Sequence, residues 1–150
     1  MKVYLAAPYR AKDQIRTYAA ELRAAGVIVT SSWLNEPHKP TTQMADLTHE
    51  EHQKYAIQDV KDVVAADILV FFTDPTRSIV RGGRHVEFGI MIGLNIARRR
   101  MSPIYVVGNQ YENIFHHLPN VIHFTDWEPL RNYLLALGNP AALPTANHAV

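Results

Sequence analysis

Residues 68–72 read Ile-Leu-Val-Phe-Phe, and this run of five apolar side chains indicates how the chain folds. A strand with one wet face alternates apolar and polar residues, whereas a strand covered on both faces does not. The run therefore predicts a central strand with helices on both sides of its sheet. The preceding segment supports this, because Thr48 and Glu51 form a capping box and apolar residues then recur with a helical period up to Ala66.

Further strands and helices alternate on either side of this run. We predict strands at 2–7, 27–30, 103–107 and 121–124, and helices at 11–25, 48–66, 84–98 and 126–137. This order indicates an α/β fold: a single-domain, flavodoxin-like or Rossmann-like three-layer sandwich around a mostly parallel five-stranded sheet. We expect the domain to span residues 1–137, and residues 138–150, rich in Pro, Ala and Asn, to form a loosely ordered tail.

The composition narrows the classes of function. The 150-residue chain has a formal net charge of +1 and no cysteine, so it lacks the basic excess of a protein that binds long nucleic acids, and it lacks thiol chemistry. It also lacks a signal-peptide pattern and any apolar run near the roughly 20 residues of a membrane-spanning helix. We therefore expect a cytoplasmic protein that acts on a small molecule and not on a membrane.

Neither a metal nor a cofactor is expected. The histidines do not have the spacing of a metal site. The glycines match neither the dinucleotide fingerprint nor the P-loop.

Residues 81–95, RGGRHVEFGIMIGLN, place one acid, Glu87, in a helix that is apolar on nearly every side. Such a helix is expected to be buried all round. Glu87 could stabilise the helix N-terminus, where the macrodipole favours an anion and Arg84 lies three residues before it. Alternatively, it could be a reactive carboxylate that faces a ligand cleft. Gly89 and Gly93 form a flat strip on this helix, which favours close packing, in part against a second subunit.

The loop that enters this helix is basic, with Gly82 and Gly83 between Arg81 and Arg84. A loop of this kind at a helix N-terminus suits a phosphate or a carboxylate, although a mobile surface loop would have the same composition. In a parallel α/β sheet, ligands bind beyond the carboxyl ends of the strands. This loop follows the central strand, so it lies at the expected edge.

Three segments together resemble the nucleoside 2-deoxyribosyltransferase family, which includes the 2-deoxynucleoside 5-monophosphate N-glycohydrolases. They are VYLAAPYR at 3–10, QDVKDVVAADILVFFTDP at 58–75 and GGRHVEFGIMIGLN at 82–95. The likeness runs from residue 2 to about residue 107. Its most specific piece is Glu-[Leu/Phe]-Gly at the start of a helix, here Glu87-Phe88-Gly89.

The resemblance implies roles for individual residues. Glu87 matches the family's catalytic glutamate, which attacks C1 of the deoxyribose and holds it as a covalent intermediate. Asp59 matches an acid that assists at the leaving base, although an acid beside an apolar stripe is commonly just solvated. Tyr4 matches a pocket position that could hydrogen-bond the nucleophile, and it could equally be a core tyrosine. The other matches are Ala7, Pro8, Tyr9 and Arg10 in the first turn, Asp74 after the central strand, and Asn113, which would serve a neighbouring subunit's site.

The resemblance implies cleavage of the N-glycosidic bond of a nucleotide or 2-deoxynucleotide, by hydrolysis or base transfer, in a homodimer or a higher homo-oligomer. We favour a hydrolase, because Arg10, Arg81 and Arg84 would suit a 5-phosphate; Trp33 could stack on the base. The alternative is a non-catalytic module that binds a nucleotide or an ADP-ribose-type ligand. The motifs leave open the base, the sugar (ribose or deoxyribose), and the acceptor (water or a second base).

Overall fold

A five-stranded, fully parallel sheet with the order β2-β1-β3-β4-β5 forms the centre of the computed structural model. The structure describes residues 1–76 and 82–138 of the 150-residue chain. The α/β class and the five-stranded sheet predicted from the sequence are confirmed. The strands are β1 (Lys2–Ala6), β2 (Ile28–Val29), β3 (Ile68–Phe72), β4 (Ile104–Val107) and β5 (Val121–Phe124).

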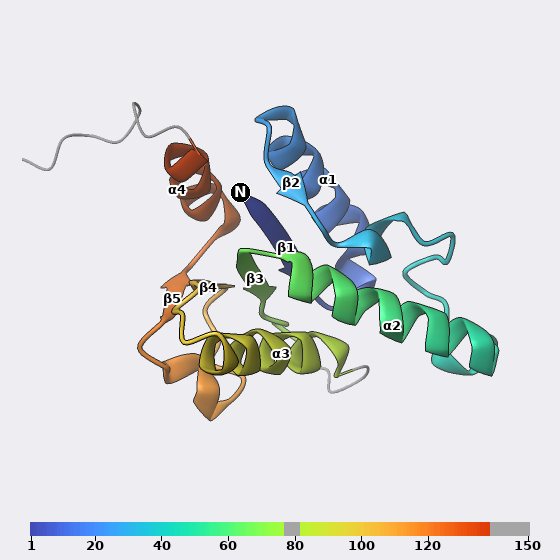
Figure 1. The fold of residues 1–150 in the computed structure, drawn as a ribbon. Coiled ribbons are helices and arrows are strands. Elements are labelled where there is room, and N and C mark those ends of the chain that lie inside the picture. The colour runs from blue at the N-terminus through green and yellow to red at the C-terminus, as the bar shows by residue number, and fades with distance from the viewer. Residues whose placement is uncertain (77–81, 139–150) are drawn as a thin grey trace, which may run out of the picture.

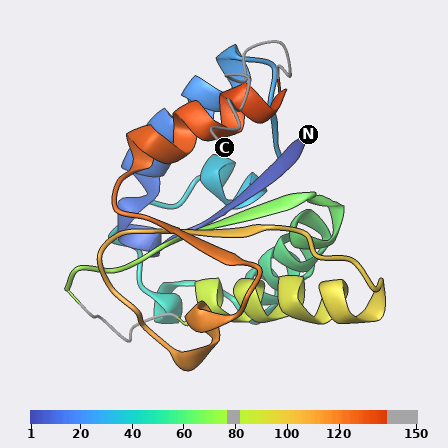
Figure 2. The same ribbon diagram turned by 90° about the vertical axis from the view of Figure 1, so that its left-hand side faces the viewer.

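Helices cover both faces of the sheet. Figures 1 and 2 show α1 and α4 on one face and α2 and α3 on the other, which confirms the three-layer arrangement. The four helices are α1 (Lys12–Ala24), α2 (His49–Ala65), α3 (Gly83–Ala97) and α4 (Trp127–Gly138). Short 3-10 helices occur in the connections: η1 (Tyr9–Ala11), η2 (Ser32–Asn35), η3 (Met44–Asp46) and η4 (Ile114–His117).

Strand β3 is the core of the sheet, and all five of its side chains are buried. It lies between β1 and β4, with Leu69 opposite Tyr4 on one side and Ile104 on the other. Its apolar run therefore packs against helices on both faces, and this burial is the main stabilising contribution. The loops after β1 and β3 leave from the same edge of the sheet.

Local signals set the ends of the helices. Thr48 Oγ1 accepts from the backbone N–H of Glu51, and the Glu51 side chain accepts from the backbone N–H of Thr48, which confirms the predicted capping box before α2. After α1, Gly26 adopts φ 81°, a conformation that residues with a side chain rarely adopt. These caps place α2 and α1 close to their predicted bounds.

A topological switch point lies between β1 and β3. The chain leaves β1 through α1 towards β2 at one edge, and returns through α2 to β3 on the other side of β1. The connections after β1 and β3 therefore diverge, and a crevice at the carboxyl ends of the strands results.

The expectation that α3 is buried all round is wrong for the single chain. Met91 is fully buried, but Val86 is 64% exposed and Ile96 73% exposed. Gly89 and Gly93 are also exposed, and an added Cβ at either glycine would meet nothing within 4 Å. The sheet and α2 cover only part of the helix, so within residues 1–76 and 82–138 nothing covers the exposed side chains of its outer face.

None of the helices within residues 1–76 and 82–138 has the length and apolar character needed to span a membrane. The tail that we expect to be loosely ordered lies outside the described residues, except for Gly138 at the end of α4.

Candidate active site

A cavity of about 340 Å³ lies beyond the carboxyl end of β1, bordered by α2 and by the N-terminus of α3. This volume is within the range of ~300–1,000 Å³ that is usual for small-molecule sites. The lining residues come from four parts of the chain that the fold brings together: the turn after β1, the connection from β2 to α2, α2 itself and the start of α3. The lining residues are Ala7, Tyr9, Trp33, Glu36, His38, Thr42, Leu47, His52, Tyr55, Ala56, Asp59, Gly82, Gly83, Arg84 and Glu87.

The three residues predicted to be catalytic lie on three different elements. Tyr4 is on β1, Asp59 is in the middle of α2, and Glu87 is near the start of α3. Helix α2 packs against α3, and both contact β1, so the three side chains converge. Glu87 and Asp59 line the cavity, whereas Tyr4 is fully buried.

The carboxyl groups of Glu87 and Asp59 hold their protons more tightly than exposed acids do. Burial, and to a lesser degree the charge of Asp59, raise the pKa of Glu87 to about 8. Burial, followed by the charge of Glu36, raises the pKa of Asp59 to about 7. At neutral pH the pair therefore carries fewer than two negative charges, and a proton is available in the cavity.

The hydroxyl of Tyr4 is buried and interacts with the carboxyl group of Glu87. Burial and the nearby charge of Glu87 raise its pKa well above the ordinary value, so it stays neutral. A neutral hydroxyl can stabilise an ionised carboxylate, and Tyr4 indeed opposes the rise in the pKa of Glu87. The Oδ1 atom of Asp59 is buried without a partner within the described ranges. Unpaired buried polar atoms of this kind mark a place for a ligand or a water molecule.

Arg84 lies at the N-terminus of α3, beside Gly82 and Gly83, and forms an ion pair with Glu112. Its Nη2 atom donates to Oε2 of Glu112 at 2.9 Å, and both side chains are buried. The other carboxylate oxygen of Glu112 accepts from the backbone N–H of Asp74. Glu112 thus ties α3 to the loop after β3. The sequence does not reveal this pairing, because Glu112 lies 28 positions after Arg84.

The connection from β2 to α2 contributes residues that the sequence analysis did not single out. Glu36 lines the cavity, and burial raises its pKa. His38 Nε2 lies 3.0 Å from the hydroxyl of Tyr55. The buried Lys12 holds this loop in place, because its Nζ atom donates to the carbonyl oxygens of Glu36 at 2.7 Å and His38 at 3.0 Å. The only signal for these residues was the unusual length of the loop.

Two predicted binding residues in the first turn lie away from the Glu87 cavity. Pro8 and Arg10 line a different cavity, on the other side of the sheet edge. Arg10 forms an ion pair with Asp74, which is 1% exposed and also accepts from the hydroxyl of Thr76 at 2.8 Å. Asp74 therefore orders the loop after β3 and does not line the Glu87 cavity. Ala7 and Tyr9, in the same turn, do line it.

Asn113, another predicted binding residue, does not line the Glu87 cavity. Asn113 Nδ2 lies 3.2 Å from Nδ1 of His85, and its Oδ1 accepts from the backbone N–H of Phe115 in η4. Arg81 lies outside the described residues. Within the described parts of the chain, no group of three or more His, Asp or Glu side chains is placed to hold a metal ion.

Comparison with known proteins gives matches among solved structures. No protein-family model and no curated protein sequence matches the chain. A 2-deoxyribosyltransferase from the psychrotolerant bacterium Bacillus psychrosaccharolyticus superposes with a TM-score of 0.66 and 20% identity, over 89% of this chain and 92% of that one. A CMP N-glycosidase from Clostridium botulinum superposes with a TM-score of 0.55 and 17% identity, over 92% of this chain and 99% of that one.

These likenesses establish the fold. The chain has the Rossmann-like α/β architecture of a 2-deoxyribosyltransferase and of a CMP N-glycosidase over most of its length. The resemblance to the nucleoside 2-deoxyribosyltransferase family, first seen in three sequence segments, is confirmed at the level of the fold.

Proposed function

We propose that this protein is an enzyme that cleaves the N-glycosidic bond of a nucleoside or nucleotide, with Glu87 as the nucleophile. The observation that carries the proposal is the convergence of Glu87 and Asp59 on one cavity, with both carboxyl pKa values raised and the buried Tyr4 behind Glu87. Raised pKa values in a cleft are typical of groups that transfer protons or attack a substrate. The two structural neighbours, a deoxyribosyltransferase and an N-glycosidase, support the same chemistry.

In the proposed reaction, an oxygen of ionised Glu87 forms a bond to C1 of the sugar as the bond from C1 to the base nitrogen breaks. The bonding electrons leave with the base, and Asp59 donates a proton to it. The product is a glycosyl ester on Glu87. Asp59, now ionised, then accepts a proton from water, whose oxygen attacks C1 and releases Glu87. Transfer to a second base would replace water in this last step.

The raised pKa values of Glu87 and Asp59 are compatible with a nucleophilic role for Glu87 and a proton-donating role for Asp59. The two carboxyl groups titrate as a coupled pair, so a single proton can be held by either of them. A sugar that develops positive charge at C1 stabilises the carboxylate form of Glu87, which moves the proton to Asp59. The Tyr4 hydroxyl acts in the same direction.

The cavity also offers groups that could hold the rest of the substrate. Tyr9 and Trp33 lie next to each other, with ring centroids 5.9 Å apart, and could flank a base. Gly82 and Gly83 at the N-terminus of α3 suit a 5-phosphate, since the first N–H groups of a helix bind anions. This arrangement is our reason for favouring a nucleotide hydrolase, although Arg10 lies elsewhere and Arg84 is paired with Glu112.

Replacement of Glu87 tests the proposal. Glu87→Gln and Glu87→Ala should each lower the release of free base from a panel of (deoxy)nucleotides by about 10³-fold or more, because no group remains to capture the sugar. Glu50→Gln, which removes an exposed charge from the first turn of α2, is the matched control and should keep full activity. Retained turnover in Glu87→Gln would refute the mechanism.

Two further measurements refine the result. Incubation of a deoxynucleotide alone, and with a second free base, separates the acceptors: exchange of bases without net hydrolysis would identify a transferase. Calorimetry separates catalysis from sensing: equally tight binding by wild type and Glu87→Gln, with no product, would instead indicate a ligand-binding module.

A further inference from the structure

A second and larger cavity, of about 690 Å³, lies on the α1 and α4 side of the sheet, at the carboxyl ends of β3, β4 and β5. Among the described residues, it has no lining residue in common with the Glu87 cavity. The segment 7–10 separates the two, because Ala7 and Tyr9 line the first cavity, whereas Pro8 and Arg10 line the second. The second cavity is therefore a distinct place in the fold.

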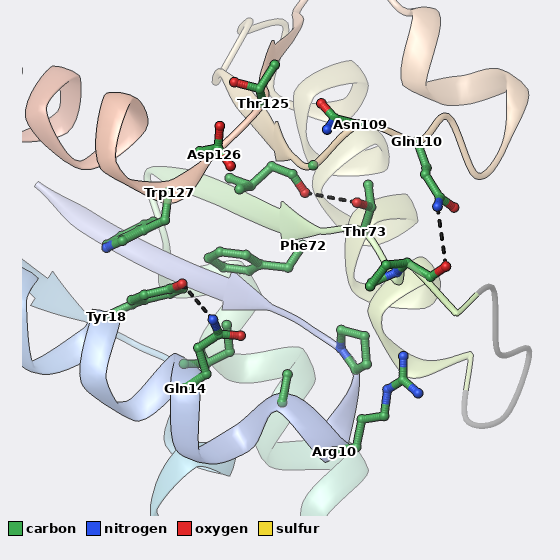
Figure 3. A pocket seen from close by; sticks show the side chains of 16 residues that line it. Arg10, Gln14, Tyr18, Phe72, Thr73, Asn109, Gln110, Thr125, Asp126 and Trp127 are labelled. Atoms are coloured by element: carbon green, nitrogen blue, oxygen red, sulfur yellow. Dashed lines mark hydrogen bonds between the residues drawn. The ribbon is translucent and has the colours of Figure 1, made fainter.

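One wall of this cavity is aromatic. The rings of Tyr18 and Trp127 are stacked, with centroids 4.6 Å apart and an angle of 16°, and Tyr18 also stacks on Phe72 at 5.8 Å. Figure 3 shows these three rings next to one another. The cluster is held from behind, since Trp127 Nε1 donates to Oε2 of Glu21 at 3.0 Å. The packed rings of Tyr18, Phe72 and Trp127 form an aromatic surface that suits a flat aromatic ligand.

The rest of the lining combines apolar residues with polar, mostly uncharged ones. Gln14, Asn109 and Gln110 contribute amide groups, and Thr73 and Thr125 contribute hydroxyls. Amides and hydroxyls both donate and accept hydrogen bonds, so they can match a ligand with donors and acceptors around its edge.

The charges in this cavity do not favour an anion. Of the lining residues that the structure describes, Arg10 alone is a cation, and its ion pair with Asp74 already neutralises it. Asp126, at the start of α4, is exposed and leaves one negative charge at the rim. An anionic ligand would be repelled by Asp126, whereas an N–H₂ group would find an acceptor there.

From these features we infer that the second cavity is a separate binding site for a neutral, planar heteroaromatic ligand with an amino group, the chemistry of a free nucleobase or a nucleoside. The aromatic wall holds the flat face or edge of the ligand, the amides and hydroxyls match its ring nitrogens and carbonyls, and Asp126 accepts from the amino group. Adenine and cytosine have this amino group and thymine lacks it. The site needs no bond cleavage at Glu87, so it stands apart from the proposed function.

The two tryptophans of the chain allow the cavities to be observed separately, because Trp33 lines the first and Trp127 the second. We would titrate the Glu87→Gln protein, which should not consume the ligand, with adenine, cytosine and thymine, their deoxynucleosides and their monophosphates. Added Trp33→Phe leaves the fluorescence of Trp127 as the reporter, and added Trp127→Phe leaves that of Trp33. The two indole N–H signals in NMR spectra of the Glu87→Gln chain give the same readout if either phenylalanine variant folds poorly.

We expect adenine and cytosine, free or as deoxynucleosides, to change the Trp127 signal saturably and more tightly than thymine. Asp126→Asn should weaken this binding about 10-fold, equivalent to about 1.4 kcal/mol, and remove the preference over thymine. Glu128→Gln, which removes a charge two residues away outside the cavity, should leave it unchanged. A response at Trp33 alone would overturn the inference, as would tighter binding of the monophosphates at Trp127 or equal effects of the two substitutions. None of these outcomes bears on whether Glu87 cleaves a glycosidic bond.

Discussion

Glu87 and Asp59 lower the stability of the folded chain whenever they ionise in the cavity. The folded pKa of Glu87 is raised from 4.5 to about 8, so between these pH values the folded chain binds more protons than the unfolded chain. Stability therefore falls as pH rises through this window. Glu87→Gln should therefore be more stable than wild type at pH 8.5, by about 1–3 kcal/mol. Each unit by which the folded pKa of Glu87 is raised corresponds to ~1.4 kcal/mol at most.

Urea unfolding at pH 5 and pH 8.5 measures this effect. The gap between Glu87→Gln and wild type should nearly close at pH 5, where Glu87 is protonated, and Asp59→Asn should behave in the same way over its own window, from 3.8 to about 7. A gap that is constant with pH would show that Glu87 is not desolvated in the folded chain.

His116 should have the opposite dependence on pH. Its ring is fully buried near Phe71 and Phe88, and neither ring nitrogen has a partner in the described structure. Burial lowers its pKa to about 4 from 6.5, with the Glu112 carboxylate opposing and three nearby histidines assisting. The unfolded chain therefore binds the extra proton, and stability falls as pH drops from 6.5 towards 4.

Replacement of His116 by Phe should remove this acid sensitivity. We expect His116→Phe to be more stable than wild type at pH 5 by about 1–2 kcal/mol, because it fills the aromatic cluster without unpaired nitrogens. His49→Phe, at an exposed position in the first turn of α2, is the control. Thermal unfolding at pH 5 and 7.5 measures this effect. The same change in unfolding temperature in His116→Phe and His49→Phe, relative to wild type, would contradict the role of His116.

At the scale of the element, α2 depends on its capping box. Thr48→Ala removes the acceptor for the Glu51 N–H and should lower the free energy of unfolding by about 1 kcal/mol. Because Asp59 is carried in the middle of α2, fraying from this end should also lower activity before global unfolding occurs. Thr41→Ala, at an exposed position outside any helix, is the control in urea titrations and hydrogen exchange.

Elements with strong local signals were predictable from the sequence. The apolar run of β3 and the box at Thr48 depend on neighbours in the chain, and the structure places both where the sequence put them. The contribution of Glu36 and His38 was not predictable, because their loop has no periodicity and is held by Lys12 from another element. The position of Arg10 was also beyond the sequence, since the side of the sheet edge that it faces is decided by its ion pair with Asp74.

At the scale of the molecule, α2 and α3 expose apolar side chains that the rest of the described chain does not cover. Val60 and Val64 on α2 are 45% and 37% exposed, and Val86 and Ile96 on α3 are more exposed still. The two helices pack against each other, and exposed apolar side chains on neighbouring helices are of the kind that protein interfaces cover. We propose that a second copy covers these side chains, as expected from Gly93 and its neighbours on α3.

A charged side chain among these exposed apolar residues should separate the copies. We expect wild type to behave as a dimer or higher oligomer at micromolar concentration in light scattering, and Gly93→Arg to behave as a monomer. Ile122→Arg, on the exposed part of β5, is the matched control and should leave the mass unchanged. A monomeric wild type would remove the proposal.

The segment 7–10 sends neighbouring side chains to different cavities, so its length is a constraint separate from its composition. A substitution there alters one cavity at a time. A deletion of one residue would shift every side chain of the segment and so disturb both cavities at once. Among related chains, changes of length in this turn should therefore be much rarer than changes of residue.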